Sequence, residues 1–268
     1  MRIGVAQTAP LLGDLQGNLT VCLEQLELAK EQNCQLVAFP ECALSGYLFE
    51  DRDSALASAI TLAGDQVAQL IEQCRRLELH CVIGALLVDD GQLWNSALLI
   101  GPQGVIGRYD KSHIPQLGVD RFVIPGKGPY EVHETTLGRI GMQICYDWRF
   151  PEVTRTLALK GADVVVMPTA SPVSSREMAD FIPRTRALEN AVFFVMASRV
   201  GTEGGAEFVG HSQVVDPSGH RLVEADDRER LVVADVELGE ARRKDRSQSG
   251  GLYSLRLLED RRPDLYFS

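Results

Sequence analysis

Two hydrophobic periods alternate along almost the whole chain. Short apolar runs such as 2–7 and 36–41 have the length and composition typical of strands. Between them, apolar residues recur every three or four positions, as in 18–33, which predicts amphipathic helices. Asn18 is the expected N-cap of that first helix. The same reading predicts further helices near 65–79, 151–160 and 178–190, and further strands near 81–88, 93–100, 105–111, 130–135, 139–144, 164–167, 193–197, 212–216, 221–224 and 231–236.

Some neighbouring strands are joined by helices and others by tight turns. This combination predicts an α/β protein in which two mixed β-sheets pack face to face with helices outside, a four-layer α-β-β-α sandwich. A dinucleotide-binding fold is not favoured, because no G-x-G-x-x-G opens a helix after the first strand. The chain also lacks an internal repeat, a low-complexity tract or a linker, which predicts a single domain over 1–268.

Three predicted strands end in side chains that can carry out chemistry. The run 139–144 ends at Cys145, and a proline follows where a helix would begin. A cysteine at such a corner lies near unpaired backbone N–H groups, which favour its thiolate. The other two strands end in Glu41 and Lys111. Strand ends are where reactive groups converge in α/β layers, so we expect a carboxylate, an ammonium and a thiol together.

Each of these residues also has a purely structural interpretation. A free cysteine is often a small buried hydrophobe. Glu41 could be a solvated loop acid, and Lys111 a surface lysine. The joint occurrence of all three at strand ends favours the chemical interpretation.

Three sequence blocks follow one another in the order Glu, Lys, Cys. They read Phe-Pro-Glu at 39–41, Tyr-Asp-Lys-Ser-His at 109–113 and Cys-Tyr-Asp at 145–147. These blocks resemble the signature blocks of the nitrilase superfamily of carbon–nitrogen hydrolases. Supporting blocks occur in the family order at 3–7, 95–97, 184–190, 210–212 and 261–266. The resemblance covers essentially the whole chain, and it implies the α-β-β-α sandwich and one carbon–nitrogen hydrolase domain over 1–268.

The three residue types suffice for amide hydrolysis through a thioester. Cys145 would attack the carbonyl carbon, and Glu41 would act as general base and then general acid. Lys111 would stabilise the oxyanion together with the backbone N–H of Tyr146. No step needs a metal or a cofactor, and the five histidines show no ligand spacing.

Members of the family often carry a second glutamate in the loop after the lysine. The matching position here is Val119, and Asp120 is one residue away, so either Asp120 or another acid takes the positioning role, with Asp120 as the candidate. Tyr47 and Trp148 lie next to the signature blocks and are candidate substrate contacts. Trp148 could equally pack within its loop. The turn-rich stretch 112–128 is long enough to be a functional loop over the site.

The sequence leaves several functions open. Tyr146 and Asp147 after the nucleophile resemble the amidase branches, which favours a small linear amide or an N-carbamoyl compound as substrate. A nitrilase that converts a nitrile to acid and ammonia is the alternative within the superfamily. A metal-dependent phosphoesterase could share the layered fold, but it needs clustered Asp, Asn and His ligands. A catalytically inactive binding protein is a third class, and the intact Glu, Lys and Cys argue against it.

Composition narrows the partners and the compartment. A formal net charge of −10 over 268 residues disfavours nucleic acid as a partner. No apolar run approaches the length of a membrane span. Six scattered cysteines without a C-x-x-C pair predict reduced thiols and a cytoplasmic protein. The C-terminal arm, 250–268, mixes leucine and tyrosine with charges, and the resemblance implies a homodimer or a higher homo-oligomer.

Overall fold

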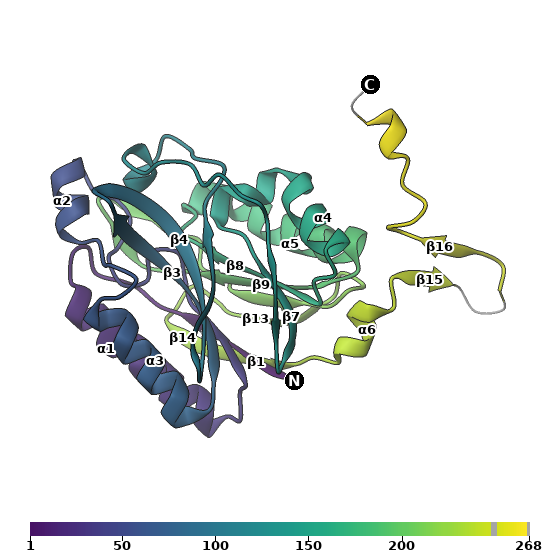
Figure 1. The fold of residues 1–268 in the computed structure, drawn as a ribbon, viewed down its shortest axis with the longest axis horizontal. Helices are drawn as coiled ribbons and strands as arrows, with labels where there is room; N and C mark the ends of the chain where they lie inside the picture. The colour runs from purple at the N-terminus through teal and green to yellow at the C-terminus, as the bar shows by residue number, and fades with distance from the viewer. Residues whose placement is uncertain (248–250, 267–268) are drawn as a thin grey trace.

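Two six-stranded mixed sheets lie at the centre of the molecule (Figure 1). The computed structural model describes residues 1–247 and 251–266. The first sheet contains, in spatial order, β14 (Arg230–Asp235), β1 (Arg2–Gln7), β2 (Leu36–Ala38), β3 (His80–Asp89), β4 (Gln92–Gly101) and β5 (Gly104–Asp110). The second contains β13 (Arg221–Glu224), β12 (Gln213–Val215), β9 (Phe193–Ser198), β8 (Val164–Thr169), β7 (Gly138–Met142) and β6 (Val132–Thr135).

Two pairs of helices cover the outer faces of these sheets (Figure 1). The first sheet is covered by α1 (Leu15–Glu31) and α3 (Asp65–Leu77), and the second by α4 (Pro151–Leu159) and α5 (Arg176–Asn190). Each pair shares one hydrophobic cluster with the sheet beneath it. A further cluster fills the space between the two sheets. The predicted four-layer α-β-β-α sandwich is therefore confirmed.

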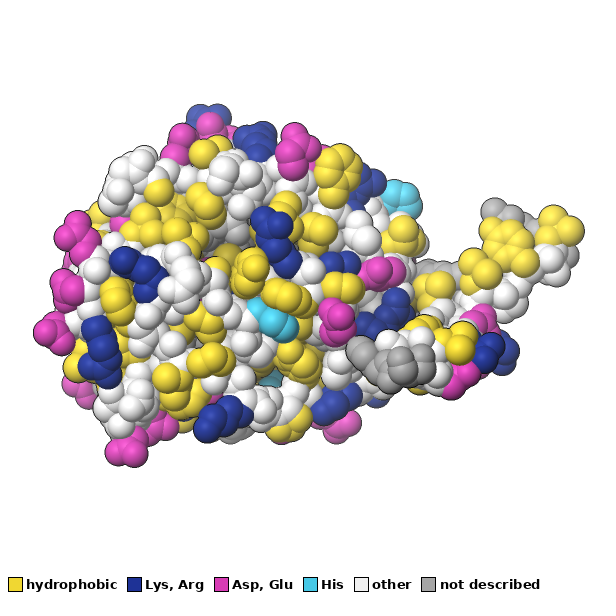
Figure 2. All heavy atoms as spheres, turned by 90° about the horizontal axis from the view of Figure 1, so that it is seen from above, with side chains coloured by type: hydrophobic (Ala, Val, Ile, Leu, Met, Phe, Trp, Pro, Cys, Tyr) yellow, Lys and Arg dark blue, Asp and Glu magenta, His cyan; other side chains and the backbone are white. Residues whose placement is uncertain are grey.

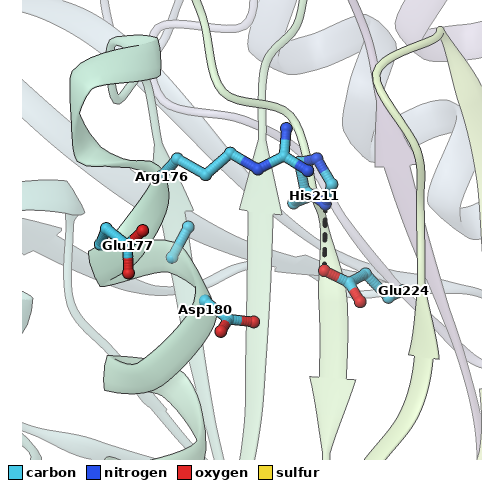
Figure 3. A pocket seen from close by; sticks show the side chains of 6 residues that line it. Arg176, Glu177, Asp180, His211 and Glu224 are labelled. Carbon is cyan, nitrogen blue, oxygen red and sulfur yellow. Dashed lines mark hydrogen bonds and ion pairs between the residues drawn. The ribbon is translucent and has the colours of Figure 1, made fainter.

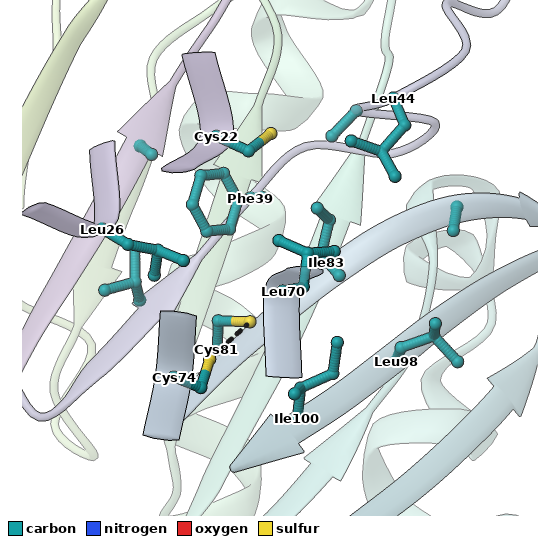
Figure 4. Packing of buried hydrophobic residues seen from close by; sticks show 14 of the residues in the cluster. Cys22, Leu26, Phe39, Leu44, Leu70, Cys74, Cys81, Ile83, Leu98 and Ile100 are labelled. Carbon is teal, nitrogen blue, oxygen red and sulfur yellow. Dashed lines mark hydrogen bonds between the residues drawn. The ribbon is translucent and has the colours of Figure 1, made fainter. Parts of the chain in front are cut away.

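Alternation along the strands produces these separate clusters. In β1, Ile3 and Val5 belong to the cluster between the sheets, whereas Ala6 belongs to the cluster beneath α1 and α3. Figure 4 shows this outer cluster, where Leu26 of α1 and Leu70 of α3 pack over the sheet. Four of the six cysteines also lie in this cluster, and all four are free thiols, as predicted: Cys22, Cys34, Cys74 and Cys81.

The start of α1 corrects one prediction. Asp14, not Asn18, is the N-cap, and its carboxylate accepts a hydrogen bond from the backbone N–H of Gly17 at 3.0 Å. Asn18 lies one turn inside the helix. Its side-chain amide donates to the carbonyl oxygens of Leu11 and Leu44, both at 2.7 Å. Asn18 therefore holds the loop after β2 against the helix, and its amide is not available for capping.

Several short elements have no period that the sequence reveals. They are α2 (Arg52–Ala57), α6 (Leu238–Arg242), the strand pairs β10 (Thr202–Glu203) with β11 (Ala206–Glu207) and β15 (Asp245–Ser247) with β16 (Ser254–Arg256), and the 3₁₀ turns η1 (Gly118–Arg121), η2 (Cys145–Arg149), η3 (Val173–Ser175) and η4 (Pro263–Leu265). Elements of two to six residues are too short for a hydrophobic period to show.

The C-terminal arm extends away from the sandwich after α6 (Figure 1). Apolar side chains are visible along it in Figure 2, and Leu252 is 85% exposed. Residues 250, 267 and 268 of the predicted arm, and residues 248 and 249 before it, lie outside the described residues. Elsewhere, no helix in the described part of the chain is long and apolar enough to span a membrane.

Candidate active site

The ends of β2 and β5 bring a buried carboxylate and a buried ammonium together. Glu41 follows β2 and Lys111 follows β5, and both side chains are fully buried. The Lys111 Nζ donates a hydrogen bond to Glu41 Oε1 at 2.7 Å and another to Asp120 Oδ2 at 2.5 Å. Lys111 is thus held between two carboxylates, of which Asp120 comes from η1.

Two neutral side chains complete this cluster. The Asn95 Nδ2 donates to Glu41 Oε1 at 2.7 Å and to Asp120 Oδ1 at 2.8 Å. The Tyr47 hydroxyl donates to Asp120 Oδ2 at 2.7 Å. Asn95 was not predicted as a site residue, although it belongs to the supporting block at 95–97. Its type carries no charge that would have marked it in the sequence.

Cys145 approaches the cluster from the second sheet. It begins η2, three residues after the end of β7, and has a backbone φ of +42°, a conformation that non-glycine residues rarely adopt. Its side chain is 8% exposed, and its Sγ lies 3.5 Å from the hydroxyl of Ser171, just after β8. The backbone N–H of Ala170 donates to Glu41 Oε2 at 2.7 Å. The end of β8 therefore contacts both Glu41 and Cys145.

Burial sets the proton equilibria of the site. The pKa of the Cys145 thiol is raised to about 12, first by burial and then by the negative charge of Glu41, while Lys111 opposes both. The predicted preference for a thiolate is therefore wrong, because loss of water around the sulfur outweighs the unpaired N–H groups of the corner. Cys145 needs a base to become a nucleophile.

The two ionisable partners of the cluster shift in the same direction. Burial raises the pKa of Glu41, the charge of Lys111 opposes this rise, and the charge of Asp120 adds to it. For Lys111, burial would lower the pKa, but the carboxylates of Asp120 and Glu41 raise it well above its usual range. The ammonium of Lys111 thus stays charged, while Glu41 titrates closer to neutrality than an exposed carboxyl group.

Asp147 connects the backbone corner at Cys145 to the loop after Lys111. Its Oδ2 accepts a hydrogen bond from the backbone N–H of Ile144 at 2.9 Å and one from the Tyr109 hydroxyl at 2.7 Å. Its Oδ1 lies 2.8 Å from Nδ1 of His113. These bonds hold the two signature blocks at 109–113 and 145–147 together. The sequence marks Asp147 as part of a signature block and of the amidase-like pair, but gives no sign of these bonds.

The sequence profile of the carbon–nitrogen hydrolase family matches residues 2–246. The chain belongs to this family. It is 34% identical over 272 residues to a protein named nitrilase from Pyrococcus abyssi, a match that covers 100% of this chain and 99% of the relative. It is also 32% identical over 251 residues to an (R)-stereoselective amidase from Pseudomonas sp., covering 91% and 89% of the two chains.

Solved structures extend the similarity to the fold. The NitN amidase from Nesterenkonia sp. AN1 matches with a TM-score of 0.83 at 27% identity, over 99% of this hydrolase and 98% of that chain. A variant of the Nesterenkonia amidase, with glutamine in place of a glutamate, carries the acetamide moiety of fluoroacetamide covalently on its active-site cysteine. This chain is similarly an enzyme with the cysteine of a thiol-dependent carbon–nitrogen hydrolase.

The remaining predicted site residues of the hydrolase lie in three different settings. Tyr146 is in the first turn of η2, where backbone N–H groups have no partner within the helix, and its ring packs edge-on against Phe150. Tyr47 is fully buried with its hydroxyl on Asp120, a place that suits positioning of that carboxylate. Trp148 is buried in the cluster beneath α4 and α5, in agreement with the packing alternative.

A separate polar cavity of about 340 Å³ lies between α5, the segment just before β12 and the end of β13 of the hydrolase (Figure 3). Arg176, Asp180 and His211 line it, and His211 Nδ1 lies 3.0 Å from a carboxylate oxygen of Glu224. Its lining residues are distinct from those around Cys145. Within residues 1–247 and 251–266, no group of three or more His, Cys, Asp or Glu side chains is arranged to hold a metal ion. The phosphoesterase alternative requires such a group.

Proposed function

We propose that this hydrolase cleaves a small linear amide or an N-carbamoyl compound to an acid and ammonia or an amine, through a thioester on Cys145. The observation that carries the proposal is the meeting of the Cys145 corner with the end of β8, whose Ala170 N–H holds Glu41. The amidase relatives support the same substrate class.

Acylation begins with a proton transfer. The Glu41 carboxylate takes the proton of the Cys145 thiol, and the sulfur forms a bond to the carbonyl carbon. The electron pair of the C=O bond moves to oxygen, where the Lys111 ammonium and the Tyr146 N–H stabilise the charge. Each such donor is worth about 3 kcal/mol of barrier. Glu41 then gives its proton to the departing nitrogen, and the C–N bond breaks.

In deacylation, Glu41 activates a water molecule in place of the thiol. Glu41 takes a proton from a water molecule, and the resulting hydroxide adds to the thioester carbon. The C–S bond breaks, the acid leaves, and the sulfur recovers its proton from Glu41. A group that gives and takes protons in turn works best when its pKa is near the working pH, and burial raises the pKa of Glu41 in that direction.

Nitrile hydrolysis is the second candidate. The supporting observation is the 34% identity to the protein named nitrilase from Pyrococcus abyssi. The same three residues could add the thiol to a C≡N carbon. The Tyr146–Asp147 pair after the nucleophile favours the amide.

An ammonia-release screen tests the proposal. The panel contains small amides, N-carbamoyl amines, ω-amides of dicarboxylates and nitriles, with Cys145→Ala as the inactive variant. Cys34→Ala is the matched control, because Cys34 packs beneath α1 and α3 rather than in the site. We expect turnover of an amide or carbamoyl compound by the wild type and the control only. Turnover by Cys145→Ala within about tenfold of wild type would exclude the thioester route, and ammonia from nitriles alone would favour the nitrilase.

A further inference from the structure

Two buried hydroxyl groups at the end of β8 lead to the nucleophile. Thr169 Oγ1 lies 2.8 Å from Ser171 Oγ, which in turn lies 3.5 Å from Cys145 Sγ. Thr169 is 0% exposed and Ser171 is 2% exposed. Ala170, between them, donates its backbone N–H to Glu41. One tripeptide thus contacts the base through its backbone and the sulfur through a side chain.

The hydrogen count of this pair leaves one donor for the sulfur. A serine hydroxyl has one hydrogen to donate and two lone pairs that accept. When Thr169 donates to Ser171 Oγ, the hydroxyl hydrogen of Ser171 is available to Cys145. After the thiol has given its proton to Glu41, the sulfur has only lone pairs and can accept this bond.

The hydrogen-bond donors of the Lys111 ammonium group already have acceptors in the proposed mechanism. An ammonium group has three hydrogens. Lys111 directs one to Glu41 and one to Asp120, which leaves one for the substrate oxygen. Stabilisation of the sulfur must then come from another group, and the Ser171 hydroxyl is in contact with it.

We propose that Ser171 is a further catalytic residue, whose hydroxyl donates a hydrogen bond to the Cys145 thiolate while Glu41 holds the proton. Thr169 is a positioning residue that orients this hydroxyl. The inference rests on the thioester chemistry of the proposed function. It agrees with the directions of the proton equilibria, because burial raises the pKa of Cys145 whereas the hydroxyl groups of Ser171 and Thr169 lower it.

The backbone around Ser171 is held independently of its side chain. The Ser171 carbonyl oxygen accepts from the N–H of Val209 at 2.9 Å, and the Thr169 carbonyl oxygen accepts from the N–H of Arg199 at 3.2 Å. Removal of the Ser171 hydroxyl therefore leaves the tripeptide anchored. Ser171→Ala should change the chemistry of the sulfur and leave the fold intact.

The test is the rate of Cys145 alkylation by iodoacetamide as a function of pH, without any substrate. Four proteins are compared: wild type, Ser171→Ala, Thr169→Val and Ser174→Ala. Ser174 is the matched control, an exposed serine three positions further along. We expect the rise of the alkylation rate with pH to begin about one pH unit higher in Ser171→Ala. At a fixed pH on this rise, the rate is then about tenfold lower than that of the wild type. Thr169→Val should move this rise in the same direction by less.

Steady-state kinetics and unfolding temperature complete the experiment. kcat/KM of Ser171→Ala should fall by about tenfold with an unchanged unfolding temperature. The proposal is overturned if the alkylation rate of Ser171→Ala at fixed pH stays within about twofold of the wild-type rate. It is also overturned if Ser174→Ala shows the same shift as Ser171→Ala. Because alkylation requires no amide, this result is independent of the substrate screen.

Discussion

Lys111→Met removes the cation that contacts both buried carboxylates, Glu41 and Asp120. Methionine keeps a long unbranched side chain but leaves Glu41 and Asp120 close together, both bonded to the amide of Asn95. Glu41 should then be harder to ionise, because the charge of Lys111 lowers its pKa. The acidic limb of kcat/KM reports the base of the free enzyme, so this limb should move to higher pH.

The size of the effect follows from the contact distance. The Lys111 Nζ is 2.7 Å from Glu41 Oε1. Charges about 4 Å apart at an effective dielectric constant of 20 interact by about 4 kcal/mol. In the variant, structural relaxation and water penetration compensate for part of this lost interaction energy. We expect the limb to move up by about one pH unit or more. Loss of the oxyanion donor should lower kcat by a further factor of about 100 to 1,000.

Asp120→Asn should produce the opposite shift. The negative charge of Asp120 raises the pKa of Glu41, so its removal should move the acidic limb to lower pH. An asparagine oxygen can still accept from the Tyr47 hydroxyl.

Lys127→Met is the matched control for Lys111→Met, because Lys127 is an exposed lysine in the loop that follows Lys111. The measurement is the pH profile of kcat/KM for the four proteins.

Stability provides a second measurement on Lys111→Met. Removing one partner of a buried ion pair costs about 3–5 kcal/mol. Because folding raises the pKa of Glu41, the folded variant binds more protons than the unfolded chain. Its stability should be greatest below the ordinary carboxyl pKa and should fall as pH rises through the folded-state value.

The pH profiles decide the assignment of Glu41, Lys111 and Cys145 as one unit. This assignment has to be abandoned if Lys111→Met and Asp120→Asn shift the acidic limb in the same direction, or if Lys111→Met keeps a near-normal rate and limb.

Two further predictions concern the metal-free chemistry and the assembly. Activity should survive EDTA and be lost with iodoacetamide, because in the proposed mechanism Glu41 and Lys111 account for proton transfer and oxyanion charge; loss on chelation that zinc or magnesium restores would contradict this. The protein should form at least a homodimer, because the arm after α6 exposes Leu252, Tyr253 and Leu265; a monomeric mass by light scattering at micromolar concentration would contradict this.

The periodic elements of the fold were predictable because the helices show an apolar stripe and the buried strands show a short apolar run. In β1, alternate residues enter two different clusters, so both faces of the strand are buried and the sequence shows a run rather than an alternation. The N-cap of α1 was not predictable in the same way. Asp14 and Asn18 are both capping types, and the choice between them depends on the bond from Asn18 to the distant carbonyl of Leu44. Such a bond exists only after the chain has folded.

The residues of the candidate site likewise fall into those that the sequence could predict and those that it could not. Glu41, Lys111 and Cys145 could be predicted because their types are chemically distinctive and each follows a strand. The thiolate of Cys145 was predicted wrongly because backbone geometry can be inferred from sequence, whereas loss of solvent around one sulfur cannot. Asn95 and Ser171 were missed because neutral polar residues acquire a role only through what they contact.

In the proposed mechanism, the hydrogen bonds of Glu41 indicate which of its two oxygens works as the base. A carboxylate offers two acceptor sites on each oxygen. Among the described residues, Oε1 accepts from Asn95 and Lys111, whereas Oε2 accepts only from the backbone of Ala170. Oε2 therefore keeps an acceptor site for the thiol proton, and it lies beside the residue that precedes Ser171. The base atom and the hydroxyl on the sulfur are thus set by adjacent residues of one strand end, a preorganisation that limits the movement required during proton transfer.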